Sequence, residues 1–410
     1  MRNVVRLSMA LVITLFVGAS LICAQENPTL VELEKAVEED SAEAMVTLGR
    51  MYLEASGNAV GVKMDGEKAL QLFEKAADKG NTDALVSLGR MYVNGWGIEK
   101  DAEKGMKFLE EAMEKGNLEA IYRIGRTYVY GVGVEKDLEK GLQFFEKAID
   151  KGYTQAMLTL GTMYLHGNAV ERDVGKALQL FENAADRGDT QATVALGGIY
   201  LHGIGGVTKD VGKALQLFEN ASEKGDMQAT VAIGSMYLYG LGVTKDIKRG
   251  MQLLENAADG GNLEAIYSLG RTYLGGFGVE KDLKKAHEWF EKAADRGGQY
   301  SAYALFFLSQ MYTDGVEGIV EQDLEKAEEL VDRIKKTRDM TAMNMFGQWY
   351  AGGVNTMGIL VKQDLKKARE WYTIVAESGI EPHAQTAKEA IEKLAREEEK
   401  EALRREADIF

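Results

Sequence analysis

The sequence has little cysteine, proline or histidine, and it lacks an excess of basic residues. Its 410 residues include one cysteine, two prolines and four histidines, and 64 Asp and Glu outnumber 49 Lys and Arg, for a formal net charge of −15. A single cysteine excludes a disulfide-stabilised scaffold. The acidic balance argues against binding to nucleic acids and anionic membranes, because basic side chains neutralise their phosphates. A regular pattern with 45% hydrophobic residues argues against a disordered chain.

The first 24 residues predict an export signal. Arg2 and Arg6 precede an uncharged apolar stretch, and the small residue Ala24 stands directly before the polar Gln25. This order is typical of a cleaved secretory signal peptide. An uncleaved membrane anchor and lipid attachment at Cys23 are the alternatives. We expect an exported protein that is periplasmic, secreted or envelope-associated, and the mature part binds no membrane unless it is lipid-anchored at Cys23.

Nine copies of one unit make up most of the rest of the chain. A tyrosine recurs in Gly-x-x-Tyr contexts, or once Ser-x-x-Tyr, every 36 to 40 residues: Tyr52, Tyr92, Tyr128, Tyr164, Tyr200, Tyr237, Tyr273, Tyr312 and Tyr350. A fixed period of this size is typical of a solenoid of stacked repeats. We predict an all-α fold with a signal peptide at 1–24, nine helix–turn–helix repeats at 29–381, and a C-terminal capping and charged helix at 382–410.

Capping residues mark the helix starts in each repeat. An aspartate precedes every second helix: Asp65, Asp101, Asp137, Asp173, Asp210, Asp246, Asp282, Asp323 and Asp364. Eight of the nine first helices follow a Ser, Asn or Asp, and Tyr153 is the exception: Ser41, Asn81, Asn117, Asp189, Asp226, Asn262, Ser301 and Asp339. Side-chain oxygens at these positions accept hydrogen bonds from the unpaired N–H groups of the first turn.

Glycine stands in the middle of eight first helices, where it costs about 1 kcal/mol relative to alanine. These positions are Gly49, Gly89, Gly125, Gly161, Gly197, Gly234, Gly270 and Gly347. The matching position of every second helix is also Ala or Gly. We therefore expect a close crossing of the two helices within each repeat.

The unit A-x-x-x-L-G-x-x-Y-x-x-G-x-G-V-x-x-D-x-x-K-A-x-x-x-F-x-x-A-A-x-x-G resembles the Sel-1-like repeat, a relative of the tetratricopeptide repeat. The seventh copy carries it at Ala265, Leu269, Gly270, Tyr273, Gly276, Gly278, Val279, Asp282, Lys285, Ala286, Phe290, Ala293, Ala294 and Gly297. The resemblance implies a right-handed α-solenoid that serves as a protein-interaction scaffold. Related proteins act in exported signalling, envelope assembly and host contact in bacteria, and in membrane-associated quality control in eukaryotes. The family has no shared catalytic motif.

The patterns that could carry chemistry are weak. Each Gly-rich loop precedes a helix whose first N–H groups an aspartate already caps, which disfavours a phosphate site. His166 and His202 occupy equivalent positions in adjacent repeats, but no third ligand joins them, whereas zinc takes three or four. No Gly-x-Ser-x-Gly occurs. We expect no enzyme activity, no cofactor and no metal.

The candidate binding residues are those of the first helices outside the packing face, which the resemblance places on a concave surface. They are Arg50, Arg90, Tyr122, Arg123, Arg126, Tyr130, His166, His202, Tyr239, Tyr267 and Arg271. Tyr and Arg are enriched at binding hot spots. Arg50, Arg90 and Arg126 share one position in three successive repeats, which favours an acidic partner segment or a C-terminal carboxylate. Solvated arginines, or arginines paired with local glutamates, are the alternative.

These observations lead to three functional hypotheses of different classes. The first is an exported, non-enzymatic scaffold or adaptor that binds a protein or peptide in its concave groove. The second is a cell-envelope structural or assembly factor that self-associates. The third is an enzyme with an unrecognised site.

Overall fold

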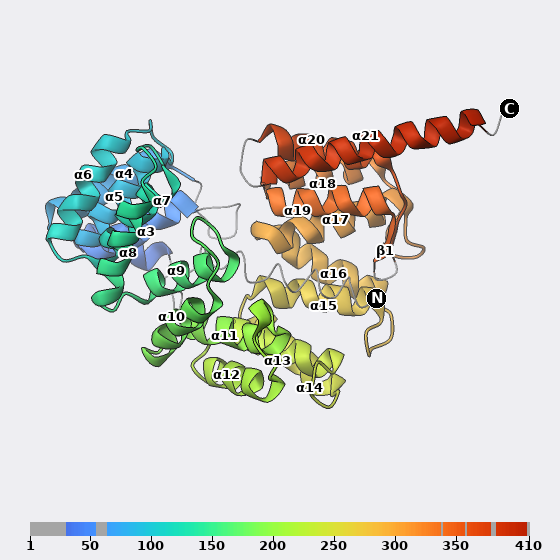
Figure 1. Cartoon of the computed structure of the whole chain (residues 1–410), viewed down its shortest axis with the longest axis horizontal. Helices are drawn as coiled ribbons and strands as arrows, with labels where there is room; N and C mark the ends of the chain where they lie inside the picture. Colours follow the sequence, from blue (N-terminus) through green and yellow to red (C-terminus); the bar gives the residue numbers. More distant parts are fainter. Residues whose placement is uncertain (1–29, 55–63, 338, 357–358, 379–382, 408–410) are drawn as a thin grey trace. The chain divides into compact units, whose positions relative to one another are not determined.

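The computed structural model describes residues 30–54, 64–337, 339–356, 359–378 and 383–407 (Figure 1). The expected signal peptide, with Cys23, lies outside the described residues. The chain divides into two compact units, Met1–Thr230 and Val231–Phe410.

Within the residues that the structure describes, nine helical hairpins follow one another, as the tyrosine period predicts (Figure 1). The first helices are α3 (Ala42–Glu54), α5 (Thr82–Asn94), α7 (Leu118–Tyr130), α9 (Thr154–His166), α11 (Thr190–His202), α13 (Met227–Tyr239), α15 (Leu263–Gly275), α17 (Gly298–Asp314) and α19 (Met340–Gly352). The second helices are α4 (Gly66–Asp78), α6 (Ala102–Glu114), α8 (Leu138–Asp150), α10 (Val174–Asp186), α12 (Val211–Glu223), α14 (Ile247–Asp259), α16 (Leu283–Ala294), α18 (Leu324–Thr337) and α20 (Leu365–Glu377).

A few elements lie outside this pattern. Helix α2 (Leu30–Glu38) packs against α3, and α21 (His383–Ala407) packs against α19 and α20. A 3-10 turn, η2 (Ile204–Gly206), and an antiparallel hairpin of β1 (Val354–Thr356) and β2 (Ile359–Val361) lie in loops between paired helices. Ala384, Ala387 and Leu394 of α21 are buried, so this helix covers the last hairpin as a cap.

The close crossing within each hairpin is present. A Cβ atom at Gly125 would lie 2.8 Å from Cδ1 of Phe145 and 3.0 Å from the carbonyl oxygen of Gly141. Phe145 is fully buried, and the other seven mid-helix glycines face a Phe, Leu or Tyr of their own second helix in the same way. The glycines thus let the two backbones approach and give the aromatic ring its space.

The capping aspartate ties the two helices of each repeat together. In all nine repeats its Oδ1 accepts a hydrogen bond of 2.9 to 3.0 Å from the backbone N–H three residues later. In the third repeat, the N–H of Asp137 donates to the carbonyl oxygen of Tyr128 at 3.0 Å. Lys140 lies over the Tyr128 ring, with Nζ 4.1 Å from its centre, and donates to the hydroxyl group at 2.7 Å.

A cation lies over the repeat tyrosine in every hairpin, with Lys in eight repeats and Arg249 in the sixth. The nitrogen of Lys, or Cζ of Arg249, is 4.0 to 5.4 Å from the ring centre. These contacts explain why the unit requires tyrosine, aspartate and lysine at a fixed spacing.

One predicted cap is wrong. Helix α17 begins at Gly298, three residues before Ser301, so Ser301 lies inside the helix and is buried. Its hydroxyl group donates to the carbonyl oxygen of Ala294 at 2.5 Å. The cause is the Gly297-Gly298 pair: both residues have positive φ angles, 75° and 78°, so the chain turns earlier and the helix gains a turn. The other seven predicted side-chain caps accept hydrogen bonds, and Tyr153 makes none.

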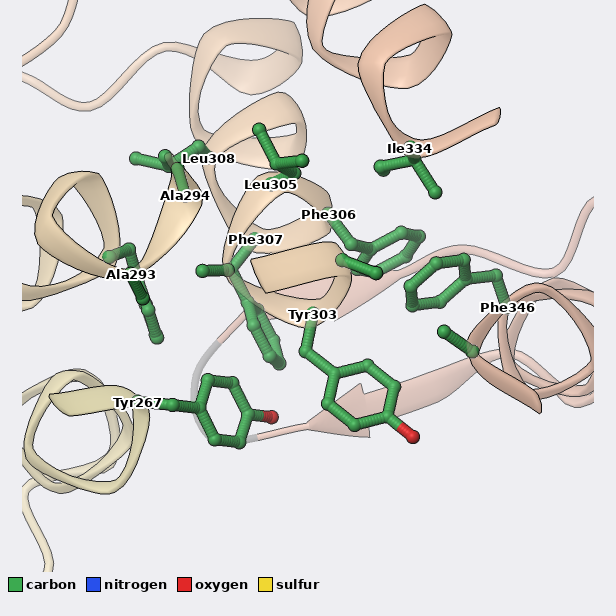
Figure 2. Close-up of a cluster of buried hydrophobic side chains, with 14 of the residues drawn as sticks. Tyr267, Ala293, Ala294, Tyr303, Leu305, Phe306, Phe307, Leu308, Ile334 and Phe346 are labelled. Atoms are coloured by element: carbon green, nitrogen blue, oxygen red, sulfur yellow. The ribbon is translucent and has the colours of Figure 1, made fainter. Parts of the chain in front are cut away.

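The second unit has a core that is rich in aromatic rings (Figure 2). Phe306 and Phe346 stack with ring centres 4.4 Å apart, and Phe290 and Phe307 stack at 5.3 Å. In Figure 2, Tyr267 and Tyr303 lie side by side beneath Phe307 and Phe306. In the first unit, by contrast, one Phe or Leu per second helix fills each hairpin.

Candidate protein-binding surface

Three arginines lie at equivalent positions on the first helices of the first unit. Arg50, Arg90 and Arg126 directly follow the mid-helix glycines of α3, α5 and α7, and each is partly buried. Because α3 contacts α5 and α5 contacts α7, these side chains follow one another from repeat to repeat. Each arginine directly follows the glycine that faces the second helix. Its side chain therefore leaves the first helix beside that contact and not into it.

The acidic residues of the same helix faces are already engaged by near neighbours. Glu119 accepts hydrogen bonds from Nε and Nη2 of Arg123 at 2.9 and 2.8 Å, and both side chains are 23% exposed. Asp83 accepts from the Asn117 side chain at 2.8 Å. Arg123 is therefore paired with a local glutamate, as the alternative interpretation of the arginines supposed.

Arg50 and Arg126 differ from Arg123. Neither makes a hydrogen bond or salt bridge with any residue in the described part of the chain. Cζ of Arg126 is 5.8 Å from the ring centres of both Tyr122 and Tyr130. In a chain with a net charge of −15, these two guanidinium groups are thus left without a paired carboxylate among the described residues.

Tyr122 is a correction to the predicted site. It is 1% exposed, packs against Phe145 and Tyr153, and shares a hydrogen bond of 2.9 Å with Thr159 of the next repeat. It is therefore a core residue that joins two repeats and offers no ring face to a partner. Tyr130, eight residues later on the same helix, is 52% exposed and fits the prediction of a surface residue.

Tyr267 is a second correction, in the second unit. It is 5% exposed and lies in the aromatic core, where burial raises its pKa to about 12 (Figure 2). Arg271 lies beside it, with Cζ 5.6 Å from the ring centre. Tyr239 is partly buried and meets Phe277 edge to face at 6.0 Å. Tyr267 and Tyr239 of the second unit are therefore largely covered by neighbouring side chains and leave little ring surface for a partner.

The two predicted histidines end α9 and α11, directly before the left-handed residues Gly167 and Gly203. His166 is partly buried, and its pKa is lowered by this burial and by the positive charge of Arg172. His202 is exposed. Nε2 of His166 is buried and has no hydrogen-bond partner among the described residues, so this ring adds no exposed positive charge to the arginines.

The sequence interpretation missed Trp96. This side chain is 43% exposed, and Cζ of Arg90 lies 5.0 Å from its ring centre. It stands between two glycines, Gly95 and Gly97, in the turn after α5, where the third repeat has Val132. The available signal was a tryptophan, the largest side chain, between two glycines in a surface turn.

Within the described residues, no group of three or more His, Cys, Asp and Glu side chains could hold a metal ion. None of the described helices combines the length and the apolar character that a membrane span requires.

Comparison with known protein families identifies the family of this chain. Nine segments match the Sel1 repeat: residues 42–81, 82–117, 118–153, 154–189, 190–226, 228–262, 263–298, 302–332 and 341–380. The chain belongs to the Sel1 repeat family. Members of this family generally act as protein–protein interaction scaffolds, and their fold is typically non-enzymatic.

Two solved structures illustrate the similarity of this Sel1 repeat protein to others. A Sel1 repeat protein from Oxalobacter formigenes is 29% identical, with 83% of this chain and 98% of that chain covered and a TM-score of 0.48. A protective antigen of uropathogenic Escherichia coli strains, with an SLR fold, is 27% identical, with 87% and 81% covered and a TM-score of 0.44. A comparison with curated proteins gave no match.

Proposed function

We propose that this Sel1 repeat protein is an exported scaffold that binds a protein or peptide along the first-helix face of its repeats. The observation that carries the proposal is the unpaired state of Arg50 and Arg126, at equivalent positions, in a strongly acidic chain. Unpaired cations of this kind steer and orient an acidic partner, either an acidic segment or a C-terminal carboxylate. Membership of a family of interaction scaffolds supports the same function.

Export is part of the proposal and is supported by the charge and hydropathy pattern of the first 24 residues. N-terminal sequencing of the protein isolated from its source cells tests it. A mature chain that begins at Gln25 is expected, in the periplasm, the medium or the envelope fraction. An intact Met1 in a cytoplasmic fraction would contradict export.

Site-specific photo-cross-linking in the source cells tests the binding face. A benzoyl-phenylalanine in place of Tyr130 reports on the first-helix face, and the same residue in place of Lys107 on α6, whose side chain is 71% exposed, is the matched control. We expect a cross-linked partner from position 130, weakened by Arg50→Ala with Arg126→Ala, and none from position 107.

The possible outcomes separate the hypotheses. No product from position 130, or the same product from both positions, would contradict binding on this face. A product that consists of two copies of this chain would instead favour the self-associating envelope factor.

A further inference from the structure

Two exposed aromatic rings lie beside the arginines. Within the described part of the chain, Trp96 and Tyr130 are the exposed aromatic side chains, and they belong to successive repeats. The guanidinium of Arg90 lies 5.0 Å from the Trp96 ring and that of Arg126 lies 5.8 Å from the Tyr130 ring. Each pair thus presents a cation and an apolar ring at one place. We call Arg50, Arg90, Trp96, Arg126 and Tyr130 the arginine–aromatic surface.

The spacing of this surface follows from the repeat. Packed helices lie about 8–10 Å apart, so the positions of Arg50 and Arg126, two repeats apart, are separated by roughly 16–20 Å. A partner peptide in the extended polyproline II conformation advances about 3.1 Å per residue and presents every third side chain on the same face. One repeat therefore corresponds to about three residues of an extended partner, and the three arginines span about six.

We propose that the arginine–aromatic surface binds an extended internal segment of a partner protein with acidic side chains about three residues apart and an apolar side chain between them. The carboxylates pair with the arginines, and the apolar side chain packs on Trp96 or Tyr130. This inference rests on the proposed function and names the chemistry of its partner.

The distribution of charge favours an internal segment over a chain end. A C-terminal carboxylate is one group at one point, and it is held best by donors that converge on it. Here the arginines come from three different helices, one per repeat, so the spacing of packed helices separates successive positions by about 8–10 Å. Several carboxylates along an extended chain match this arrangement.

Selection from a random peptide library tests the proposal. The full chain is the bait, and the displayed peptides are about twelve residues long, roughly twice the expected contact length. We expect an enriched pattern of Asp or Glu at a spacing of about three, with an aliphatic or aromatic residue between them. The selected peptides are then synthesised both as free acids and as C-terminal amides, and the two forms are expected to bind equally.

Variants assign the binding to the surface. Arg50→Gln with Arg126→Gln, and separately Trp96→Ala, are each expected to weaken binding at least about tenfold, because charge-assisted pairs and aromatic anchors contribute this much. Lys107→Gln with Lys115→Gln removes two exposed charges of α6 and serves as the matched control, with affinity unchanged. Circular dichroism verifies that each variant is folded.

Tryptophan fluorescence gives a second readout. The chain has four tryptophans, and the other three, Trp289, Trp349 and Trp371, belong to the second unit. Peptide binding is expected to shift the emission of the wild-type chain and to leave that of Trp96→Phe unchanged.

Three results would overturn the inference. They are a basic or neutral consensus, binding that does not respond to the two arginine substitutions, and binding by the free acid alone. In each case a peptide still binds, so the proposed scaffold function stands. Failure to enrich any peptide over a blank surface would also overturn the inference, while photo-cross-linking from position 130 separately decides the proposed scaffold function.

Discussion

Replacing Gly125 by alanine tests whether the helix crossing is the reason for the glycine. The new Cβ atom would lie 2.8 Å from the buried ring of Phe145 and 3.0 Å from the carbonyl oxygen of Gly141, so the backbones or the ring must move. Overpacking of this kind costs about 1–3 kcal/mol, whereas alanine favours the helix by about 1 kcal/mol. The difference is a net destabilisation of about 0–2 kcal/mol, with about 1 kcal/mol as the central expectation.

Two further substitutions make the test quantitative. At Gly234 the nearest atoms to the new Cβ are 3.1 and 3.2 Å away, so Gly234→Ala is expected to be close to neutral. At Gly212 the added methyl would meet only Asp210 Oδ1 at 3.5 Å, so Gly212→Ala is expected to be neutral or stabilising.

The assay must report on individual repeats, because a solenoid need not unfold in one step. Urea unfolding gives the overall change in stability, and amide hydrogen exchange in α7 and α8 shows whether the loss is local. The reasoning is refuted if Gly125→Ala is as stable as the wild type, or if Gly234→Ala is the more damaging of the two.

Three other predictions concern single side chains. Asp137→Ala removes the cap of α8 and is expected to cost about 1 kcal/mol, measured by urea unfolding, with loss of exchange protection in the first turn of α8. Tyr122→Ala is expected to lower the free energy of unfolding by about 3–5 kcal/mol, as for a buried aromatic ring. Tyr130→Ala should leave the unfolding midpoint nearly unchanged while weakening partner binding. Equal midpoints for the two variants would contradict the assignment of Tyr122 to the core. The folded-state pKa of His166 lies below its unfolded value of about 6.5, so its stabilising contribution is present above that pH and is lost as the pH falls. Thermal unfolding of the wild type and of His166→Gln is therefore compared between about pH 5 and 7.5. The variant should lose less thermal stability than the wild type as the pH falls.

The sequence alone predicts what depends on local chemistry. The caps at Asp137 and Asn117 and the left-handed end at Gly131 follow from neighbouring residues, and the structure has them at those residues. Ser301 failed as a cap because the two glycines before it move the helix start, a competition that cap chemistry alone does not rank.

Features that depend on the packing of one repeat on the next are harder to predict. Tyr122 and Tyr130 look alike on a single helix, but Thr159 and Tyr153 of the fourth repeat cover only the former. The contact of Lys140 with Tyr128 joins residues twelve positions apart through a turn, so its geometry is visible only once the hairpin is closed. The pairing of Trp96 with Arg90 is hidden from the sequence for the same reason.

The tyrosine, aspartate and lysine contacts and the glycine crossing are all completed inside a single hairpin. An in-frame duplication or deletion of one period in the genome would therefore preserve every one of these bonds, and only the junction with the neighbour would have to adapt. The chain can lengthen or shorten in whole units of about 8–10 Å, the distance between packed helices. Gene rearrangement can thus change the length of the repeat array without requiring a new hydrophobic core.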